Sequence, residues 1–422
     1  MTFRTDLAYA RELDAADELR ELRPRFVIDD RQLIYVDGNS LGRLPRASLD
    51  LSRNLLERQW GSRLIRAWND SWFHLAEKIG AKIARIIGAD PDEVIVADST
   101  SVNLFKLVMA ALKARPDRVK LATDDLNFPS DIYVFQSAIN LARPKRRLAM
   151  ARSPDGITIP IQLLEEIIDA QTALVASSHT AFKSGFVHDM ASVTALAHDR
   201  GALMLWDLSH SVGAVPVDLG KSGVDLAVGC TYKYLNGGPG SPAFLYIRQE
   251  LIDHLSNAIA GWFGQENQFG FDLDYRPAAG LRKFLTGTPP IASLALIEPG
   301  VDLVLEAGLD RIRKKSIAQT EYLIELWETI LAPLGFTLNS PREARLRGSH
   351  VSFGHPEGWR IDRALIDRMA VIPDFRRPDN IRIGVSPLYT TFEELHATAT
   401  AMHRVVDDRL YEDYPIEQLG VT

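Results

Sequence analysis

Residues 225–243 read Asp-Leu-Ala-Val-Gly-Cys-Thr-Tyr-Lys-Tyr-Leu-Asn-Gly-Gly-Pro-Gly-Ser-Pro-Ala, and the fold is organised around this stretch. Its apolar run, Leu226–Gly229, predicts a buried strand that delivers Lys233 to the start of a glycine-rich loop. An unpaired ammonium group is costly to bury, so a lysine at this point indicates chemistry in which the amine forms a Schiff base. The alternative is a surface lysine whose stem lies along apolar surface while its charge reaches water.

A second apolar strand precedes this stretch and ends in an acid. Residues 202–207 read Ala-Leu-Met-Leu-Trp-Asp. Open α/β sheets build their sites at the carboxyl ends of parallel strands. Asp207 and Lys233 on two such ends suit pyridoxal phosphate, because the lysine holds the aldehyde as an imine and the acid pairs with the pyridinium nitrogen. Taken alone, Asp207 is equally well explained as a helix N-cap.

Composition limits the classes of function. The 422 residues are 46% hydrophobic and 24% charged, which predicts a globular protein long enough for two domains. A net charge of −7 argues against a nucleic-acid surface, and no apolar run reaches membrane-spanning length. The lone Cys230 cannot form an internal disulfide, and the charged N-terminus lacks a signal-peptide core. We therefore expect a cytoplasmic protein without a nucleic-acid or membrane partner, and no metal-binding motif is present.

Two strand-to-helix turns carry further candidate ligands. Val94-Ile95-Val96-Ala97 predicts a strand, and the hydroxyl-rich Ser99-Thr100-Ser101 follows it before a helix. Free N–H groups and the helix dipole at such a turn favour an anion such as phosphate, although simple helix capping explains the same residues. In the second turn, residues 127–131, Phe128 is placed to stack on a pyridine ring, and Ser130 and Asp131 either bind the cofactor or cap the helix.

Strands and helices alternate through most of the chain. Strands are predicted at 94–97, 121–122, 173–177, 202–207 and 226–229, with helical patterns between them. This alternation predicts an α/β fold with a mostly parallel sheet covered on both faces. After residue 345 the elements are shorter, which indicates a small C-terminal α/β domain.

Several motifs together resemble one known family. They are Trp-Asp-Leu-Ser-His-Ser-Val-Gly-Ala at 206–214, Cys-Thr-Tyr-Lys-Tyr-Leu-Asn-Gly-Gly-Pro-Gly at 230–240, and Phe-Pro-Ser-Asp at 128–131. The chain resembles the kynureninases of bacterial type, which are fold-type-I pyridoxal phosphate enzymes of the class V aminotransferase superfamily. The resemblance runs from about Gly38 to Thr391. It implies an N-terminal segment (1–45) joining the small domain, a large cofactor domain (46–290) with a seven-stranded sheet, and a small domain (291–422).

The resemblance also implies residue roles. Lys233 would carry the cofactor and remove the substrate α-proton, Asp207 would pair the ring nitrogen, and Tyr232 would act as acid and base, with Asp131 beside the ring. The cofactor-binding set would be Thr100, Ser101, Phe128, Ser130, Asp131, Ser178, Asp207, His210, Tyr232, Lys233, Trp262 and Thr288. The substrate-binding set would be Arg382, which holds the α-carboxylate, with Asn39, Trp60, Gly287 and Thr288.

The activity implied by the resemblance is hydrolytic Cβ–Cγ cleavage of L-kynurenine to anthranilate and L-alanine in tryptophan degradation. 3-Hydroxy-L-kynurenine would be a weaker substrate, because Trp60, Gly287 and Thr288 offer an apolar wall around the aniline ring. The segments around Trp262 and Thr288 imply a homodimer with shared active sites.

Two alternatives stay open at this point. The first is another enzyme of the superfamily, an aminotransferase or a cysteine desulfurase, although a desulfurase needs a cysteine on a mobile loop. The second is a catalytically silent module that binds pyridoxal phosphate.

Overall fold

The computed structural model describes residues 4–417, and its main body is a mostly parallel sheet. Within these residues the sheet has seven strands in the order β2-β8-β7-β6-β5-β3-β4. β8 runs antiparallel to both of its neighbours and the other pairs are parallel, which confirms the predicted sheet. The strands are β2 (Val94–Val96), β3 (Lys120–Asp124), β4 (Arg147–Ala151), β5 (Thr172–Ser178), β6 (Leu203–Asp207), β7 (Leu226–Gly229) and β8 (Phe244–Ile247).

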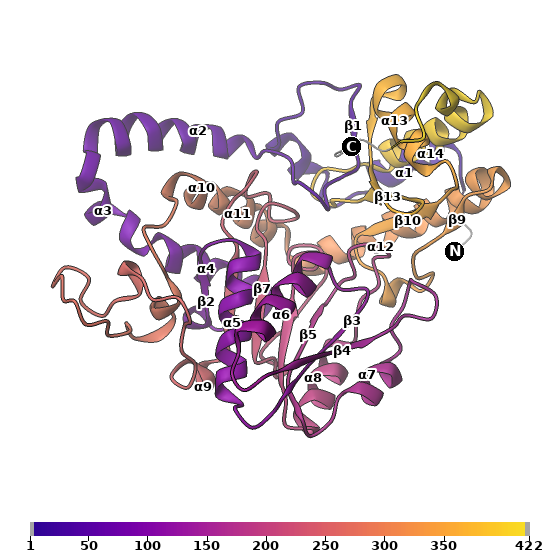
Figure 1. Cartoon of the computed structure of the whole chain (residues 1–422). Coiled ribbons are helices and arrows are strands. Elements are labelled where there is room, and N and C mark those ends of the chain that lie inside the picture. Colours follow the sequence, from indigo (N-terminus) through magenta and orange to yellow (C-terminus); the bar gives the residue numbers. More distant parts are fainter. Residues whose placement is uncertain (1–3, 418–422) are drawn as a thin grey trace.

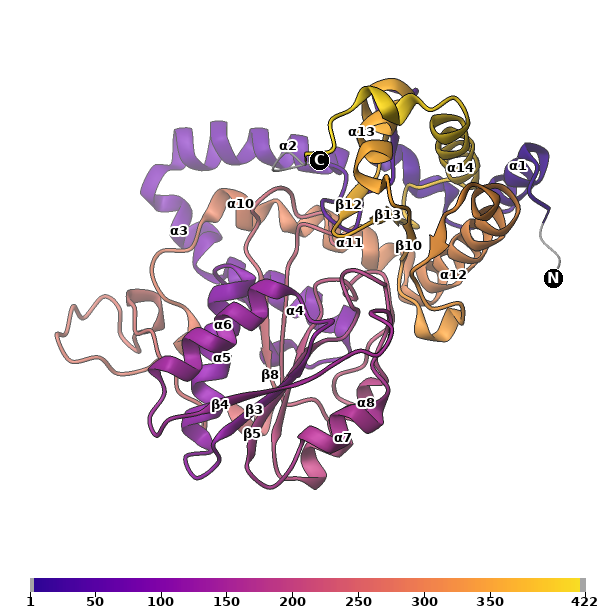
Figure 2. The same ribbon diagram turned by 45° about the vertical axis from the view of Figure 1, so that its right-hand side comes forward.

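Helices cover this sheet on both faces. Figure 2 shows α5 and α6 on one side of the strands and α7 and α8 on the other. Every residue of β5, β6 and β7 is buried, as expected for continuous apolar runs in a doubly covered sheet. The helices of this part are α4 (Leu75–Ile87), α5 (Thr100–Ala114), α6 (Pro129–Leu141), α7 (Ile161–Ile167), α8 (Met190–Asp199) and α9 (Gln249–Ile252).

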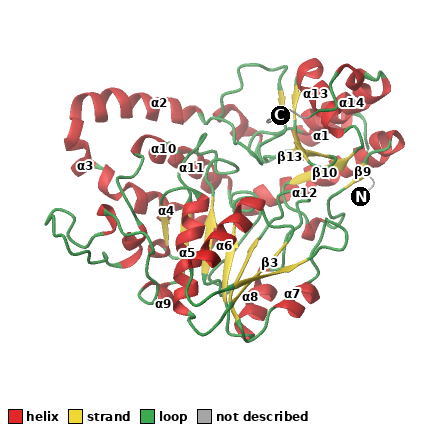
Figure 3. Cartoon of the chain, in the orientation of Figure 1, coloured by secondary structure: helices red, strands yellow, loops and turns green. Residues whose placement is uncertain are grey.

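A second, smaller sheet stands beside the first (Figure 3). It is antiparallel, with the order β12-β13-β10-β9. Its strands are β9 (Thr337–Leu338), β10 (His350–Gly354), β12 (Asp374–Arg376) and β13 (Asn380–Gly384), and a separate parallel pair joins β1 (Ile34–Tyr35) to β11 (Val371–Ile372). The helices around it are α12 (Leu309–Leu326), α13 (Gly358–Met369) and α14 (Phe392–Asp407).

Each sheet has its own hydrophobic core. The core of the large sheet includes residues from Leu19 to Ile312 in α12, together with Leu388 and Tyr389. The core of the small sheet includes residues from Tyr322 of the same helix onward, together with Ala10 and Val36. α10 (Ile291–Ala295) and α11 (Ile297–Ala307) pack on the large core. The predicted division after residue 290 stays a prediction, and we propose α12 as the better place for it.

The N-terminal helix α1 (Leu7–Ala15) packs on the small part. The Asp14 carboxylate accepts hydrogen bonds from the backbone N–H groups of Phe392 and Glu393, at 2.8 and 2.9 Å. These groups open α14, where the unsatisfied N–H groups and the helix dipole favour a carboxylate. Arg11 adds an ion pair with Glu393 at 2.9 Å. Farther along, Leu19, Leu22 and Phe26 belong to the core of the large sheet, so the predicted association of the whole segment 1–45 with the small domain stays a prediction.

A long arm and a loop project from the large part on the same side (Figure 1). The arm is α2 (Arg46–Asn54), continued by a π-helical segment, Leu55–Arg63, and followed by α3 (Ala67–Asp70). The loop lies between α9 and α10, and both regions expose large apolar side chains. Among residues 4–417, no helix combines the length and the apolar composition that crossing a membrane requires.

Candidate active site

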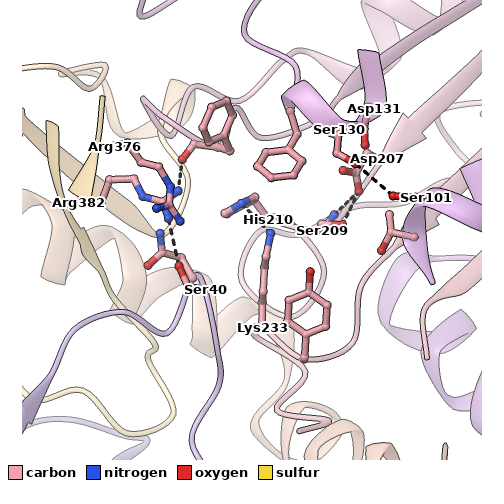
Figure 4. A pocket seen from close by; sticks show the side chains of 15 residues that line it. Ser40, Ser101, Ser130, Asp131, Asp207, Ser209, His210, Lys233, Arg376 and Arg382 are labelled. Carbon is pink, nitrogen blue, oxygen red and sulfur yellow. Dashed lines mark hydrogen bonds between the residues drawn. The ribbon is translucent and has the colours of Figure 1, made fainter. Parts of the chain in front are cut away.

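A cavity of about 310 Å³ lies where the carboxyl ends of the large-sheet strands face the small sheet. Figure 4 shows its side chains converging from both parts of the chain. The large part contributes Thr100, Ser101, Phe128, Ser130, Asp131, Phe182, Asp207, Ser209, His210, Tyr232 and Lys233, and the remaining lining residues are Asn39, Ser40, Arg376 and Arg382. The two residues chosen first from the sequence, Asp207 and Lys233, therefore face one cavity.

Lys233 follows β7 and is held by a histidine. Its Nζ lies 2.9 Å from His210 Nε2. Burial, and then the charge of Lys233, lower the pKa of His210 well below its usual value. The imidazole is therefore neutral at physiological pH, and its Nε2 accepts a hydrogen bond from the lysine amine. This contact turns the amine toward the middle of the cavity, as Figure 4 shows.

Two acids face the opposite side of the cavity. Asp207 ends β6, and its Oδ1 accepts hydrogen bonds from the Ser209 backbone N–H at 2.8 Å and from the Ser209 hydroxyl at 2.6 Å. Asp131 is buried, and its Oδ2 has no hydrogen-bond partner among residues 4–417. Burial, and then the charge of Asp207, raise the pKa of Asp131 well above its usual value. The pair suits a cationic N–H group such as a protonated pyridine nitrogen.

Two helix N-termini meet at the next part of the wall. Ser101 opens α5 and Ser130 opens α6, and their hydroxyl oxygens lie 3.2 Å apart. Ser99 caps α5 by accepting from the Val102 N–H at 3.4 Å, whereas no side chain caps α6. The hydroxyls of Thr100 and Ser101 are thus not used as caps. The convergence of two dipoles and several hydroxyls suits a phosphate dianion.

Aromatic side chains complete this end of the cavity. Phe128 is 41% exposed, and its ring makes an edge contact with Phe182, with 5.1 Å between centroids. Its exposed surface is available for a flat ring to stack on. The proximity of the Cys230 thiol, followed by burial, raises the pKa of Tyr232, so its phenol stays protonated. A lysine, two acids, a phosphate cup and an aromatic platform in one cavity fit pyridoxal phosphate.

The small sheet supplies the other end of the cavity. Arg382 on β13 donates from Nε to Asp374 Oδ1 at 2.9 Å, from Nη2 to Ser40 Oγ at 3.2 Å, and from Nη1 to the Phe182 carbonyl. Asn39 is fully buried, and neither polar atom of its side chain has a partner among the described residues. Because buried amides are costly to leave unpaired, Asn39 is available to a polar ligand.

Five of the predicted site residues do not line this cavity. Trp60 on the π-helical segment is 63% exposed, and Trp262 is half-exposed in the projecting loop, where it donates to the Gln268 carbonyl at 2.7 Å. Gly287 and Thr288 line a separate cavity of about 100 Å³. Ser178 ends β5 without lining the cavity, and its hydroxyl donates to Asn127 Oδ1 at 2.6 Å. The roles of these residues stay predictions, since a single chain does not gather them.

Four lining residues were given no role of their own from the sequence: Ser40, Phe182, Ser209 and Arg376. Arg376 was within reach of sequence reasoning. In residues 374–382 two short strands carry polar residues at alternate positions, and pairing them places Asp374, Arg376 and Arg382 on one face. Phe182 offered no comparable signal, because it lies in a loop and reaches the cavity through tertiary packing.

Comparison with known proteins agrees with this geometry. Residues 312–402 match the family model described as "Kynureninase C-terminal domain". The kynureninase of Pseudomonas fluorescens is 43% identical over 416 residues, covering 97% of each chain. The kynureninase of Burkholderia mallei (strain SAVP1) is 40% identical over 400 residues, covering 94% of each.

Solved structures share the fold at low identity. The apo cysteine desulfurase from Thermococcus onnurineus NA1 superposes with a TM-score of 0.79 at 20% identity, covering 92% of this chain and 98% of that one. A C-DES mutant with glycine covalently linked to the PLP cofactor gives a TM-score of 0.77 at 19% identity, covering 91% and 98%. At this identity the likeness establishes the fold alone, whereas the relatives that match along the whole chain establish the family. The chain therefore belongs to the kynureninase family of pyridoxal-phosphate-dependent hydrolases acting on carbon–carbon bonds.

Proposed function

We propose that this enzyme hydrolyses L-kynurenine to anthranilate and L-alanine. One observation carries the proposal: a single cavity has the Arg382 guanidinium at one end, the Asp207 carboxylate at the other, and the Lys233 amine between them. An α-amino acid has its amine and its carboxylate on one carbon, so it would reach Lys233 and Arg382 at once. The bidentate match between arginine and carboxylate would fix the Cα–H bond relative to Lys233.

Pyridoxal phosphate, when bound, supplies an electron sink for the bonds broken at the substrate carbons. Lys233 would hold the cofactor and then move the proton at Cα, because its amine points into the cavity. Asp207 would keep the ring nitrogen protonated, and Ser209 orients that carboxylate through two hydrogen bonds. Neutral His210 would accept a hydrogen bond from the amine of Lys233 whenever the lysine is free of the cofactor.

Tyr232 is the residue we assign to the carbonyl chemistry. Its phenol lines the cavity next to Lys233, and its raised pKa keeps it protonated at neutral pH. The phenol would donate its proton to the γ-carbonyl oxygen as water adds and would take one proton of that water in return, so that the carbonyl hydrate forms and the phenol is regenerated before the Cβ–Cγ bond breaks. General acid–base groups of this kind contribute about 10²–10⁴-fold to rate.

Cysteine desulfurase activity, which the structural neighbours raise, is disfavoured by Cys230. This single cysteine of the chain is buried beside β7, and burial raises the pKa of its thiol. A nucleophilic thiolate needs a lowered pKa and access to the substrate. A purely binding role is disfavoured because Asp207, Tyr232, Lys233 and Arg382 are all present around one cavity.

The test mixes purified enzyme and pyridoxal phosphate with L-kynurenine and follows the fluorescence of anthranilate. Release of anthranilate and L-alanine in equal amounts supports the proposal. Sulfide from cysteine, transamination of kynurenine, or no turnover would each contradict it. 3-Hydroxy-L-kynurenine, measured in the same assay, should show a lower kcat/KM, because the residues predicted around the aniline ring offer few polar atoms to hydrogen-bond its extra hydroxyl.

We also propose that the protein is a cytoplasmic homodimer with shared active sites. The arm exposes Leu49, Leu56, Trp60, Leu64 and Ile65, and the loop exposes Trp262, Phe269, Phe271, Leu273 and Tyr275. An exposed apolar surface of this extent, on one side of the chain, is typical of an interface. A second copy covering it would explain why Trp262 and Thr288 do not reach the cavity of their own chain.

Mixing variants tests this dimer. Lys233→Ala chains and Thr288→Ala chains are each expected to be impaired, and a mixture should regain activity because one site of each hybrid has both residues intact. Mixing each variant with itself is the control. A monomer by light scattering with normal turnover would contradict the proposal.

A further inference from the structure

A second guanidinium shares the substrate end of the cavity with Arg382. β12 and β13 pair antiparallel, with Asp374 opposite Arg382 and Arg376 two residues further along β12. Side chains at paired positions, and at positions two apart, share one face of a sheet. The three side chains therefore lie on the face turned to the cavity, and Phe375 and Ile381 lie on the core face. Figure 4 shows both guanidinium groups at the same end.

The two arginines differ in how open they are. The Arg382 side chain is 1% exposed, and its Nε, Nη1 and Nη2 all donate within the protein. The Arg376 side chain is 36% exposed, with Nη2 2.6 Å from Asp374 Oδ2 and Nη1 donating to the Phe375 carbonyl at 3.0 Å. An incoming carboxylate therefore meets Arg376 as the more accessible cation, while Arg382 forms the enclosed back of the site.

The surrounding charges leave a positive excess at this place. Asp374 pairs with both arginines, so one carboxylate faces two guanidinium groups. Two further acids lie nearby, and burial, followed by the charge of Asp374, raises the pKa of Asp37 to about 7 and that of Asp362 to about 8. Their carboxyl groups are largely protonated below those values and neutralise the arginines only in part. The arrangement can therefore accept one more anionic group.

We propose that Arg376 is a substrate-binding residue that shares the α-carboxylate with Arg382, and that Asp374 positions both guanidinium groups. This deepens the proposed function and rests on it for the identity of the ligand as an α-amino acid. Two guanidinium groups on one carboxylate provide directional, charge-assisted hydrogen bonds that a lysine pair would not match.

The test compares a ligand that has the carboxylate with one that lacks its charge. Binding of L-alanine and of L-alaninamide to the holoenzyme is measured by calorimetry for the unmodified protein, Arg376→Gln, Arg376→Lys and the control Arg377→Gln. Arg377 is the adjacent exposed arginine, so its variant makes the same change in net charge. Arg376→Gln should weaken L-alanine binding about 10- to 100-fold, the range for a charged hydrogen bond, and change L-alaninamide binding less than about twofold. Arg376→Lys should restore part of the loss.

Three results would overturn the assignment: equal weakening for both ligands, unchanged binding in Arg376→Gln, or an equal loss in Arg377→Gln. Kinetics add a second readout, since loss of uniform binding raises KM for L-kynurenine with little change in kcat. The two proposals fail separately. If the unmodified enzyme releases no anthranilate but Arg376→Gln weakens L-alanine binding selectively, the Arg376 assignment holds and the proposed function fails. If the unmodified enzyme releases anthranilate and Arg376→Gln binds L-alanine normally, only the proposed function holds.

Discussion

The two ends of the cavity are built in different ways. At the cofactor end the polar groups follow strands of the large sheet, and their partners come from the same part of the chain, as Ser209 orients Asp207 from two residues away and His210 contacts Lys233 from 23 residues away. At the arginine end the contacts join distant segments, and Arg382 bonds Ser40 and Phe182 across 342 and 200 residues. The cofactor end is thus a product of local topology, whereas the arginine end exists only when the small sheet meets the large one.

This difference separates two kinds of failure. Damage at the cofactor end should affect cofactor retention and the chemical step, because those residues would touch the reacting atoms. Damage at the arginine end should affect substrate affinity and leave the cofactor in place. The predictions below, in order of decreasing effect on turnover, test that separation.

Lys233→Ala should have the largest effect, a loss of roughly 10⁴-fold or more in kcat, because the group that would carry the cofactor and move the proton is gone. Borohydride reduction and peptide mapping of the holoenzyme should label the peptide that contains Lys233. Lys221→Ala, at an exposed lysine, is the control and should behave like the unmodified protein. A label on any other lysine contradicts the assignment.

Asp207→Asn should lower kcat/KM by about 10²–10⁴-fold, since losing one partner of a buried charge pair costs about 3–5 kcal/mol. The amide keeps the shape of the carboxylate but not its charge, so cofactor dissociation should also become measurable by dialysis and absorbance. Ser209→Ala, which keeps the carboxylate and removes one of its hydrogen bonds, should show a smaller loss. Full cofactor retention with normal turnover in Asp207→Asn would contradict the statement that the cofactor end controls cofactor retention and the chemical step.

Arg382→Gln should raise KM for L-kynurenine by about 10- to 100-fold through the loss of a charged hydrogen bond, with cofactor affinity unchanged. Parallel titration of the apoenzyme with pyridoxal phosphate checks the second half of this expectation. Arg404→Gln, on the exposed side of α14, is the matched control. If Arg382→Gln released the cofactor as readily as Asp207→Asn, the two ends would not be separable.

Asp362→Asn should affect stability and leave kcat within about twofold. Burial raises the pKa of Asp362 from 3.8 to about 8 in the folded state, so the folded chain keeps a proton that the unfolded chain releases above about pH 4. The associated stability is therefore fully present below about pH 4 and is lost as the pH rises through about 8. Urea unfolding at pH 5 and pH 8.5 should show a smaller difference for Asp362→Asn than for the unmodified protein.

The control for that measurement is Asp367→Asn, at an exposed residue of the same helix. It should keep the pH dependence of the unmodified protein. An Asp362→Asn variant with the full pH dependence would show that Asp362 does not hold a proton in the folded state.

Much of the cofactor end was predictable from sequence because its signals are local. Apolar runs that end in Asp207 or lead to Lys233, and hydroxyls at the start of helices, follow directly from strand burial and helix termini. The same reasoning found Arg382 only through the family motif and gave Arg376 no role, because the sequence does not show that β12 and β13 pair and turn this face toward the cavity. For Trp60 and Trp262 the sequence predicted roles in the site, but neither residue lines the cavity of its own chain. Their roles would require a second copy of the chain.

The sequence by itself determined the α/β fold class with its mostly parallel sheet and indicated the cofactor, because burial periodicity and strand-end chemistry are encoded in short stretches. The seven-stranded sheet and the family came from the resemblance of its motifs to the kynureninases. The tertiary structure alone decided which residues share the cavity. It placed Arg376 beside Arg382, turned His210 toward Lys233, and left Ser178 and Thr288 outside the cavity lining. The physical reason is that the cavity forms only where the two sheets and their connecting segments pack together, as in the hydrogen bonds of Arg382 to Phe182 and Ser40 across 200 and 342 residues.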